Sequence, residues 1–300
     1  MLTALHGDPL KLREASNRRR PPRASHGARG TVPLLDRAAV WEASNSTHIS
    51  VGSSGGKEPV FSALGELEGI RVHKLSVQGR PVLWSCASPK PSPNAAESKK
   101  ENKSWLLSVL LRDFRGMTYG TDPKSTELPS DFDIILDRMG KPFLVLNDSV
   151  GPGISFTHCN GMTWAAMTDP ESNLGIDAAR AEEFQGDYPI HRVFRRDELD
   201  PLPEKTKGDR AESAAMVWSA KEAFVKAIGC AFHLFSPLEV SATPLEVQPD
   251  HSRFLLQLLD KALERFPFNG KSQAEISSFR FADSWVSVAA VGRNYTGRTS

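Results

Sequence analysis

Glu222 and Lys226 are four residues apart in a stretch that has the pattern of a long helix. Residues four apart lie one turn apart on the same helix face, so the carboxylate and the ammonium are neighbours, and Trp218 shares that face. Such a pair could hold a divalent cation and a phosphate. It could equally be an ordinary surface ion pair, worth only about 0.3 kcal/mol. The spacing alone leaves both interpretations open.

The helix that must carry this pair has recognisable ends. Asp209 followed three residues later by Glu212 has the spacing of a capping box, and Gly229 is suited to the left-handed position after a helix. We therefore predict a helix from about residue 210 to residue 228. Its apolar face carries Ala220, Phe224, Ala227 and Ile228.

Three further residues that could take part in catalysis or binding lie earlier in the chain. His158 is in an alternating segment, 154–159, that predicts a strand; a lone histidine on an apolar face is usually a hydrogen-bonded core residue. Asp177 follows an apolar strand and could simply cap a short helix starting at Ala178. Lys141 lies in a tight turn of the composition Met-Gly-Lys-Pro.

Composition narrows the class of protein. The 300 residues carry a formal net charge of +1, which is no signature of nucleic-acid or membrane binding. Three widely spaced cysteines form no metal-binding pattern and favour a reduced compartment. No apolar run approaches the roughly 18 residues that span a bilayer. We expect a cytoplasmic protein that binds neither membrane nor nucleic acid.

The chain divides into a tail and two folded parts. Residues 1–60 are rich in Arg, Ser, Gly and Pro, which predicts a disordered tail. The rest has the pattern of an α+β protein with two related subdomains, 61–168 and 169–293. The expected elements are a hairpin at 70–84, a buried helix at 105–112, strands at 132–137, 143–146, 154–159 and 162–167, a short basic helix at 191–196, an amphipathic segment at 253–265, and strands at 275–281 and 284–291.

Four segments, in this order, resemble the 4′-phosphopantetheinyl transferase superfamily, in particular its larger type that activates peptide and polyketide synthetases. They are Gly140-Lys141-Pro142, Phe156-Thr157-His158-Cys159, Gly175-Ile176-Asp177 and the helix segment 218–229. The family patterns are a GKP turn, an F-N-x-S-H-S-like strand, G-[IV]-D-x-E, and W-S-x-K-E-[AS]-x-x-K-x-x-G. The last of these is the most specific, and the resemblance covers about residues 61–292.

The resemblance implies a fold and a reaction. Members have two similar α+β subdomains in a pseudo-twofold pair, with coenzyme A and Mg²⁺ in the cleft between them. The serine hydroxyl of an apo acyl- or peptidyl-carrier protein attacks the β-phosphate of coenzyme A, phosphopantetheine is transferred, and 3′,5′-ADP leaves. The larger type is usually a monomer. The alternative is a protein that binds coenzyme A or a carrier without turnover.

The resemblance also implies roles for individual residues. Asp177 and Glu222 match the metal ligands, and Glu222 is in addition the candidate general base, acting directly or through a metal-bound water. Lys226 is expected to contact the phosphates. The other expected contacts to coenzyme A are His158, Lys141, Thr157, which stands where the family usually has Ser, and Lys221, for which a solvated lysine is an equal alternative.

One departure from the family pattern concerns the metal site. Ala179 stands where G-[IV]-D-x-E has a third carboxylate, so a water would have to fill that coordination position. Glu182 and Glu183 are near in sequence, but nothing in the sequence assigns either to the gap. Trp218 is expected to pack beneath the helix. The basic residues Arg192, Arg195 and Arg196 could dock an acidic carrier or simply be solvated.

Overall fold

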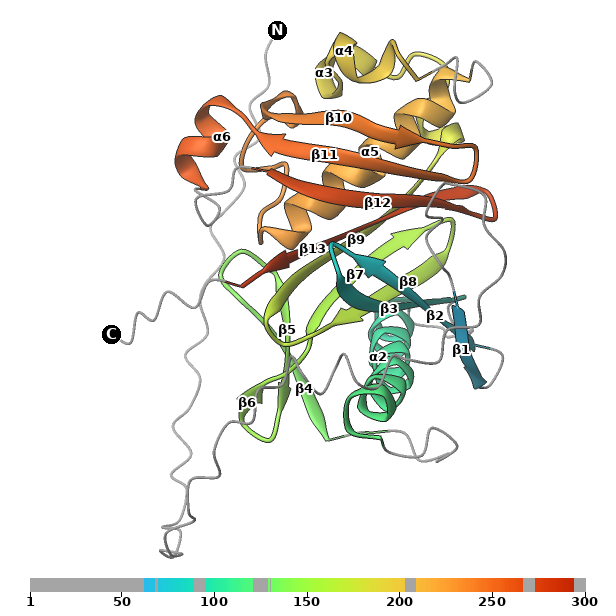
Figure 1. The fold of residues 1–300 in the computed structure, drawn as a ribbon, viewed down its shortest axis with the longest axis vertical. Helices are drawn as coiled ribbons and strands as arrows, with labels where there is room; N and C mark the ends of the chain where they lie inside the picture. Colours follow the sequence, from blue (N-terminus) through green and yellow to red (C-terminus); the bar gives the residue numbers. More distant parts are fainter. Residues whose placement is uncertain are drawn as a thin grey trace, which may run out of the picture. The chain divides into compact units, whose positions relative to one another are not determined.

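The computed structural model describes residues 62–67, 70–88, 95–120, 129, 131–202, 209–266 and 273–293. The predicted disordered tail, residues 1–60, lies outside them. The described residues belong to a single compact unit. Figure 1 shows their helices and strands.

The N-terminal part contains a five-stranded antiparallel sheet, here called sheet A. Its order is β1 (Ser62–Leu67), β2 (Ile70–Val77), β3 (Arg80–Ala87), β8 (Met162–Thr168) and β7 (Gly153–Cys159). The long helix α2 (Ala95–Tyr119) packs against β3 and β8. It includes the predicted buried helix at 105–112 but is much longer than predicted. The first turns of α2 are polar, so no apolar periodicity marked them in the sequence.

A small three-stranded sheet projects from the N-terminal part (Figure 1). It consists of β4 (Phe132–Leu136), β5 (Pro142–Leu146) and β6 (Ser149–Val150). The turn between β4 and β5 contains Gly140, whose φ of 82° suits glycine, followed by Lys141. This hairpin therefore holds the GKP segment.

The C-terminal part contains a second five-stranded antiparallel sheet, here called sheet C. Its order is β10 (Val240–Val247), β11 (His251–Leu258), β12 (Gln273–Phe281), β13 (Ser284–Gly292) and β9 (Ser172–Arg180). Its helices and helical turns are η1 (Ala181–Phe184), α3 (Ile190–Val193), α4 (Arg196–Leu199), α5 (Arg210–Ala227), η2 (Pro237–Glu239) and α6 (Asp260–Arg265).

Sheet C has an apolar layer on each face. Ala179, Trp285 and Ala289 face α5 in the larger core cluster. The alternate residues Ile176 and Val288 face sheet A, where they form a second cluster with residues of that sheet such as Trp84 and Trp164. Sheet C is therefore packed between α5 and sheet A, and its strands read as apolar on both faces.

Helix α5 begins and ends as the sequence predicts. The Asp209 side chain accepts hydrogen bonds from the backbone N–H groups of Ala211 (2.8 Å) and Glu212 (3.3 Å). Gly229 has a φ of 79° just after the helix. Burial is not confined to one face: of the last three turns, only Trp218, Glu222, Lys226 and Ile228 are partly exposed.

Two local predictions were wrong. Asp177 lies inside β9, which continues to Arg180, so it neither ends a strand nor caps a helix at Ala178. The segment 191–196 is not one helix, because Phe194 and Arg195 are extended between α3 and α4. The segment 253–265, predicted only as amphipathic, contains the last six residues of β11 and the whole of α6.

The predicted α+β class with two similar parts is confirmed: each part has a five-stranded antiparallel sheet and one long helix. The boundary between residues 168 and 169 stays a prediction.

The three cysteines are free thiols. Within the described residues, the helices are all too short or too polar to cross a membrane.

Candidate active site

The first part of the site is the contact between β7 and β9, the adjacent edge strands of sheets A and C. The backbone N–H of Ile176 donates to Ser155 Oγ at 3.0 Å. Two residues further along β7, on the same strand face, Thr157 Oγ1 donates to Asp177 Oδ1 at 2.8 Å. Two hydroxyls thus hold β7 against β9, and one of them orients the Asp177 carboxylate, which is only 6% exposed.

Gly175 lets α5 approach the same strand closely. A Cβ at position 175 would lie 1.8 Å from the carbonyl oxygen of Ala223, so only glycine fits. Gly175 and Asp177 lie on one face of β9 because side chains alternate along a strand. The close approach at Gly175 therefore brings α5 next to Asp177, which gives the Gly-Ile-Asp segment a structural reason.

Asp177 and Lys226 meet directly. Lys226 Nζ donates to Asp177 Oδ1 at 2.6 Å and to the backbone oxygen of Ile176 at 3.2 Å. The ammonium is partly exposed, while the carboxylate is buried. The fold thus brings three of the predicted site residues into contact: Thr157 from β7, Asp177 from β9 and Lys226 from α5.

Glu222 is one turn before Lys226 on α5 and near the same carboxylate. Burial and, after it, the charge of Asp177 raise the pKa of Glu222, the charge of Lys226 lowers it, and the net result is a pKa of about 7. A carboxyl group with a pKa close to neutral can take up or release a proton at physiological pH. The buried Asp177 carboxylate and the partly exposed Glu222 carboxylate also provide oxygen ligands of the kind that a hard cation prefers.

The donor set fits Mg²⁺ in number and type. Mg²⁺ typically uses one or two protein carboxylates and keeps several waters. Among the described residues no group of three or more His, Cys, Asp or Glu side chains is placed to hold a metal. Ala179 is 1% exposed and packs in the core beneath α5, so the position of the third family carboxylate is apolar here. Two carboxylates plus waters remain compatible with Mg²⁺.

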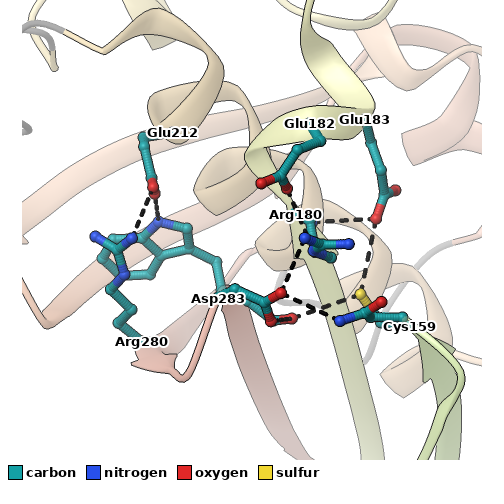
Figure 2. A network of polar contacts seen from close by, with 10 residues as sticks. Cys159, Arg180, Glu182, Glu183, Glu212, Arg280 and Asp283 are labelled. Carbon is teal, nitrogen blue, oxygen red and sulfur yellow. Dashed lines mark hydrogen bonds and ion pairs between the residues drawn. The ribbon is translucent and has the colours of Figure 1, made fainter.

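Glu182 and Glu183 do not fill the gap at Ala179. Figure 2 shows both in a polar network around Arg180. Glu182 pairs with the Arg180 guanidinium at 3.2 Å, and Glu183 accepts the Arg180 backbone N–H at 3.1 Å. The same guanidinium pairs with Asp283 at 2.9 Å. Glu182 and Glu183 therefore hold η1 to the end of β9, and Asp283 ties the same strand end to the turn between β12 and β13.

Lys141 lies at the C-terminal end of α5 and not beside Asp177. Its Nζ donates to the backbone oxygen of Ala227, the last residue of the helix, at 2.6 Å. Burial and, after it, the charge of the nearby Arg293 lower the pKa of Lys141 to about 7. The side chain therefore caps a helix end, where a cation is favourable to the helix dipole.

His158 is not a core histidine. It is exposed, although Ile154 on the same strand face is buried. Because neighbouring residues point to opposite faces of a strand, His158 points away from the face on which Thr157 contacts Asp177. Its predicted contact to a phosphate stays a prediction.

Lys221 is not solvated and does not point at the other site residues. Its side chain is 0% exposed, and Nζ forms an ion pair with Glu198 Oε2 at 2.8 Å. It also donates to the backbone oxygens of Val193 and Pro237, each at 3.1 Å. We therefore assign Lys221 to holding α3, α4 and η2 on α5, and do not retain it as a contact to coenzyme A.

Two residues near the site were missed at the level of sequence. Glu198, the partner of Lys221, comes just after the predicted basic helix at 191–196 and was assigned to no element. Tyr188 lies near Glu222. The pKa of Tyr188 is raised mainly by burial and to a smaller extent by the charges of Glu183 and Glu222. Neither belongs to a recognised segment. Trp218 packs as predicted, stacked on Phe232 with ring centroids 5.3 Å apart.

Comparison with known proteins adds the following. Residues 173–285 match the family model described as the 4′-phosphopantetheinyl transferase superfamily, so the resemblance is confirmed for the region containing β9 and α5. No curated protein matches the chain. Among solved structures, one match is described as "Chronobacterium ammoniagenes ACPS-CoA complex"; it is 21% identical and covers 41% of this chain and 98% of that chain, with a TM-score of 0.34.

Proposed function

We propose that this protein transfers the 4′-phosphopantetheine group of coenzyme A to a serine of an apo carrier protein, with Mg²⁺ as the metal. The observation that carries the proposal is the convergence of Thr157, Asp177, Glu222 and Lys226. These residues come from three separate segments with family patterns, and their contacts join β7, β9 and α5. The family match over residues 173–285 supports the same reaction.

In the proposed reaction, the serine oxygen forms a bond to the β-phosphorus of coenzyme A. The bond from that phosphorus to the bridging oxygen breaks, and 3′,5′-ADP leaves with the electron pair. The serine proton must go to a base. Glu222 is the proposed acceptor, either directly or through a metal-bound water.

Lys226 is proposed to hold the phosphates. Its ammonium now neutralises Asp177, but its side chain is 29% exposed and attached to the end of α5, so it can turn to an incoming anion. A positive charge at this position stabilises the negative charge that develops on the phosphate oxygens. Thr157 and His158 on β7 and Lys141 at the helix end are proposed as further contacts to coenzyme A.

Asp177 and Glu222 would hold the metal ion. When bound there, Mg²⁺ would neutralise charge on the pyrophosphate and the leaving group. Asp177 is buried and oriented by Thr157, so its position is defined before any cation binds. Glu222 would need to be ionised to act as a ligand.

The proposed partner is an apo acyl- or peptidyl-carrier protein, and the chain is proposed to act as a cytoplasmic monomer. Carriers of fatty-acid, polyketide and non-ribosomal-peptide synthesis all fit. The exposed Arg192 and Arg196 on α3 and α4 could attract an acidic carrier, whereas Arg195 is already paired with Asp197. This docking would weaken as ionic strength rises.

The test is incubation of the full chain with coenzyme A, Mg²⁺ and a panel of apo carrier proteins. We expect at least one carrier to gain the mass of one phosphopantetheine, with release of an equal amount of 3′,5′-ADP. Absence of any mass gain, where a reference transferase modifies the same carriers, would refute the proposal. Binding of coenzyme A without release of 3′,5′-ADP would instead favour the non-catalytic alternative.

A further inference from the structure

A row of buried polar residues crosses sheet C beneath α5. Cross-strand register places Ser252 of β11 opposite Ser278 of β12, Ser278 opposite Ser287 of β13, and Ser287 opposite Asp177 of β9. Directly opposite residues share one sheet face. All three serines are 0% exposed. The row therefore leads, strand by strand, to the carboxylate at the centre of the proposed site.

Helix α5 adds a fourth hydroxyl to this row. Ser219 Oγ lies 2.7 Å from Ser287 Oγ, which lies 2.6 Å from Ser278 Oγ. Ser219 also donates to the backbone oxygen of Met216 at 3.0 Å. In each serine pair either hydroxyl can be the donor, and the three side chains form one continuous hydrogen-bonded chain from α5 to sheet C.

Small residues bring this helix face close to the sheet. Ala223 and Ala227 are one and two turns beyond Ser219, and their backbone atoms lie against Gly175 at the closest approach of helix and strand. At the start of the helix, Trp285 of β13 donates to Glu212 at 2.6 Å. A short buried hydrogen bond is directional, so the bond between Ser219 and Ser287 can act together with these contacts to fix the position of α5 along its axis.

We infer that Ser219 and Ser287 are positioning residues whose hydrogen bond sets where α5 lies along β13 and so places Glu222 and Lys226 opposite Asp177. Ser287 is the direct cross-strand neighbour of Asp177, and Ser219 is three and seven residues before Glu222 and Lys226. A displacement of the helix at Ser219 is therefore transmitted to the residues that meet Asp177. The inference rests on the proposed function for its catalytic consequence, but not for its geometry.

Ser252 offers a matched control for a substitution test. It has the same residue type, the same complete burial and the same sheet row, but its Oγ has no hydrogen-bond partner among the described residues. Ser252→Ala removes one buried hydroxyl without touching the chain to α5. Ser219→Ala and Ser287→Ala each remove the bond under study.

The first measurement is structural and needs neither carrier nor metal. In crystal structures we expect Ser219→Ala and Ser287→Ala to show α5 displaced along β13, with the ion pair between Lys226 and Asp177 lengthened. Ser252→Ala should keep both as in the unsubstituted protein. An unmoved helix with an intact ion pair in Ser219→Ala would overturn the inference, whether or not the protein proves to be a transferase.

The second measurement is kinetic, on carriers that the unsubstituted protein modifies. Because small misplacements of reacting groups are costly, we expect kcat to fall about tenfold or more in Ser219→Ala and Ser287→Ala, with KM for coenzyme A changed much less. The double variant should be no worse than the poorer single variant, since both remove one bond. A kcat equal to that of Ser252→Ala would contradict the inference. No transfer by the unsubstituted protein would instead refute the proposed function, leaving the structural measurement to decide.

Discussion

At the scale of single residues, the contacts of the site meet at Asp177. Its Oδ1 accepts from Thr157 and Lys226, and its charge helps to raise the pKa of Glu222. Without a bound cation, Lys226 supplies the positive charge that this buried carboxylate needs. A divalent cation at Asp177 would take over that role, and we expect Lys226 then to be available to a phosphate.

The first prediction concerns the two carboxylates. Asp177→Asn and Glu222→Gln keep the side-chain shape but remove the charge, so we expect each to lower the rate of 3′,5′-ADP release by about 100-fold or more. Glu182→Gln is the control, because this exposed carboxylate contacts Arg180 and lies outside the site. Initial rates at saturating coenzyme A measure the effect. Rates in Asp177→Asn or Glu222→Gln close to that of Glu182→Gln would exclude the proposed metal ligands.

Several site residues could be predicted because their chemistry depends on local pattern. Helical spacing put Glu222 and Lys226 on one face, and the family patterns added Asp177 and Thr157. Lys221 could not be placed this way, because what buries it comes from distant segments, α4 and η2. The exposure of His158 could not be predicted either. The alternating pattern indicates which face of the strand a residue is on, but not whether another element covers that face.

At the scale of elements, the distance between β9 and α5 decides whether the site forms. In Gly175→Ala the new Cβ would collide with the Ala223 carbonyl, so we expect a loss of about 3 kcal/mol or more in the free energy of unfolding. Phosphopantetheine transfer should fall with it. Gly186→Ala is the control: the position has a positive φ but open space, and should cost only about 1–2 kcal/mol. Equal losses in urea denaturation for the two variants would disprove the close contact.

The buried pair of Lys221 and Glu198 attaches α4 to α5. Glu198 also accepts the backbone N–H groups of Arg195 at 2.8 Å and Ala242 at 2.9 Å, so it joins α4 to β10 as well. Lys221→Met leaves a buried carboxylate without its cation, and we expect it to lower the free energy of unfolding by about 3–5 kcal/mol. Lys221→Met combined with Glu198→Gln should cost less than Lys221→Met alone. A stable Lys221→Met variant with weakened coenzyme A binding would instead restore the original prediction of a phosphate contact.

The end of α5 carries a pH-dependent contact through Lys141. The folded pKa of about 7 is below the usual value for lysine, so between pH 7 and about 10 the unfolded chain binds more protons than the folded one. The contribution of Lys141 to the free energy of unfolding therefore rises as the pH increases from 7 to about 10, and it is lost as the pH falls back to 7. We expect the melting temperature of the unsubstituted protein, relative to Lys141→Met, to increase from pH 7 to 10. Lys261→Met, at an exposed position, gives the baseline for removing a lysine. A flat difference would contradict the burial of Lys141.

At the scale of the whole molecule, the sequence predicted the α+β fold class and most of the strands. It did not predict that sheets A and C pack against each other around one common apolar cluster. Period-two alternation marked the strands 154–159 and 70–77, which lie at or near sheet edges. The segment 253–265 was predicted only as amphipathic, and that pattern did not separate the end of β11 from the short α6 that follows it. Which strands face each other across two sheets depends on long-range packing, which no local pattern contains.

The shared core leads to a prediction about cooperativity. The cluster between the sheets combines Trp84 and Trp164 of sheet A with Ile176, Phe279 and Val288 of sheet C. A fragment of residues 169–293 would expose this apolar face to water and would also lose the Ser155 and Thr157 contacts to β9. We therefore expect residues 61–293 to unfold in one calorimetric transition, with calorimetric and van't Hoff enthalpies equal. The fragment 169–293 should lack a cooperative transition and should not transfer phosphopantetheine. Two separate transitions in 61–293, or a folded 169–293 fragment, would show that the two sheets are independent subdomains and that the site forms only when they dock.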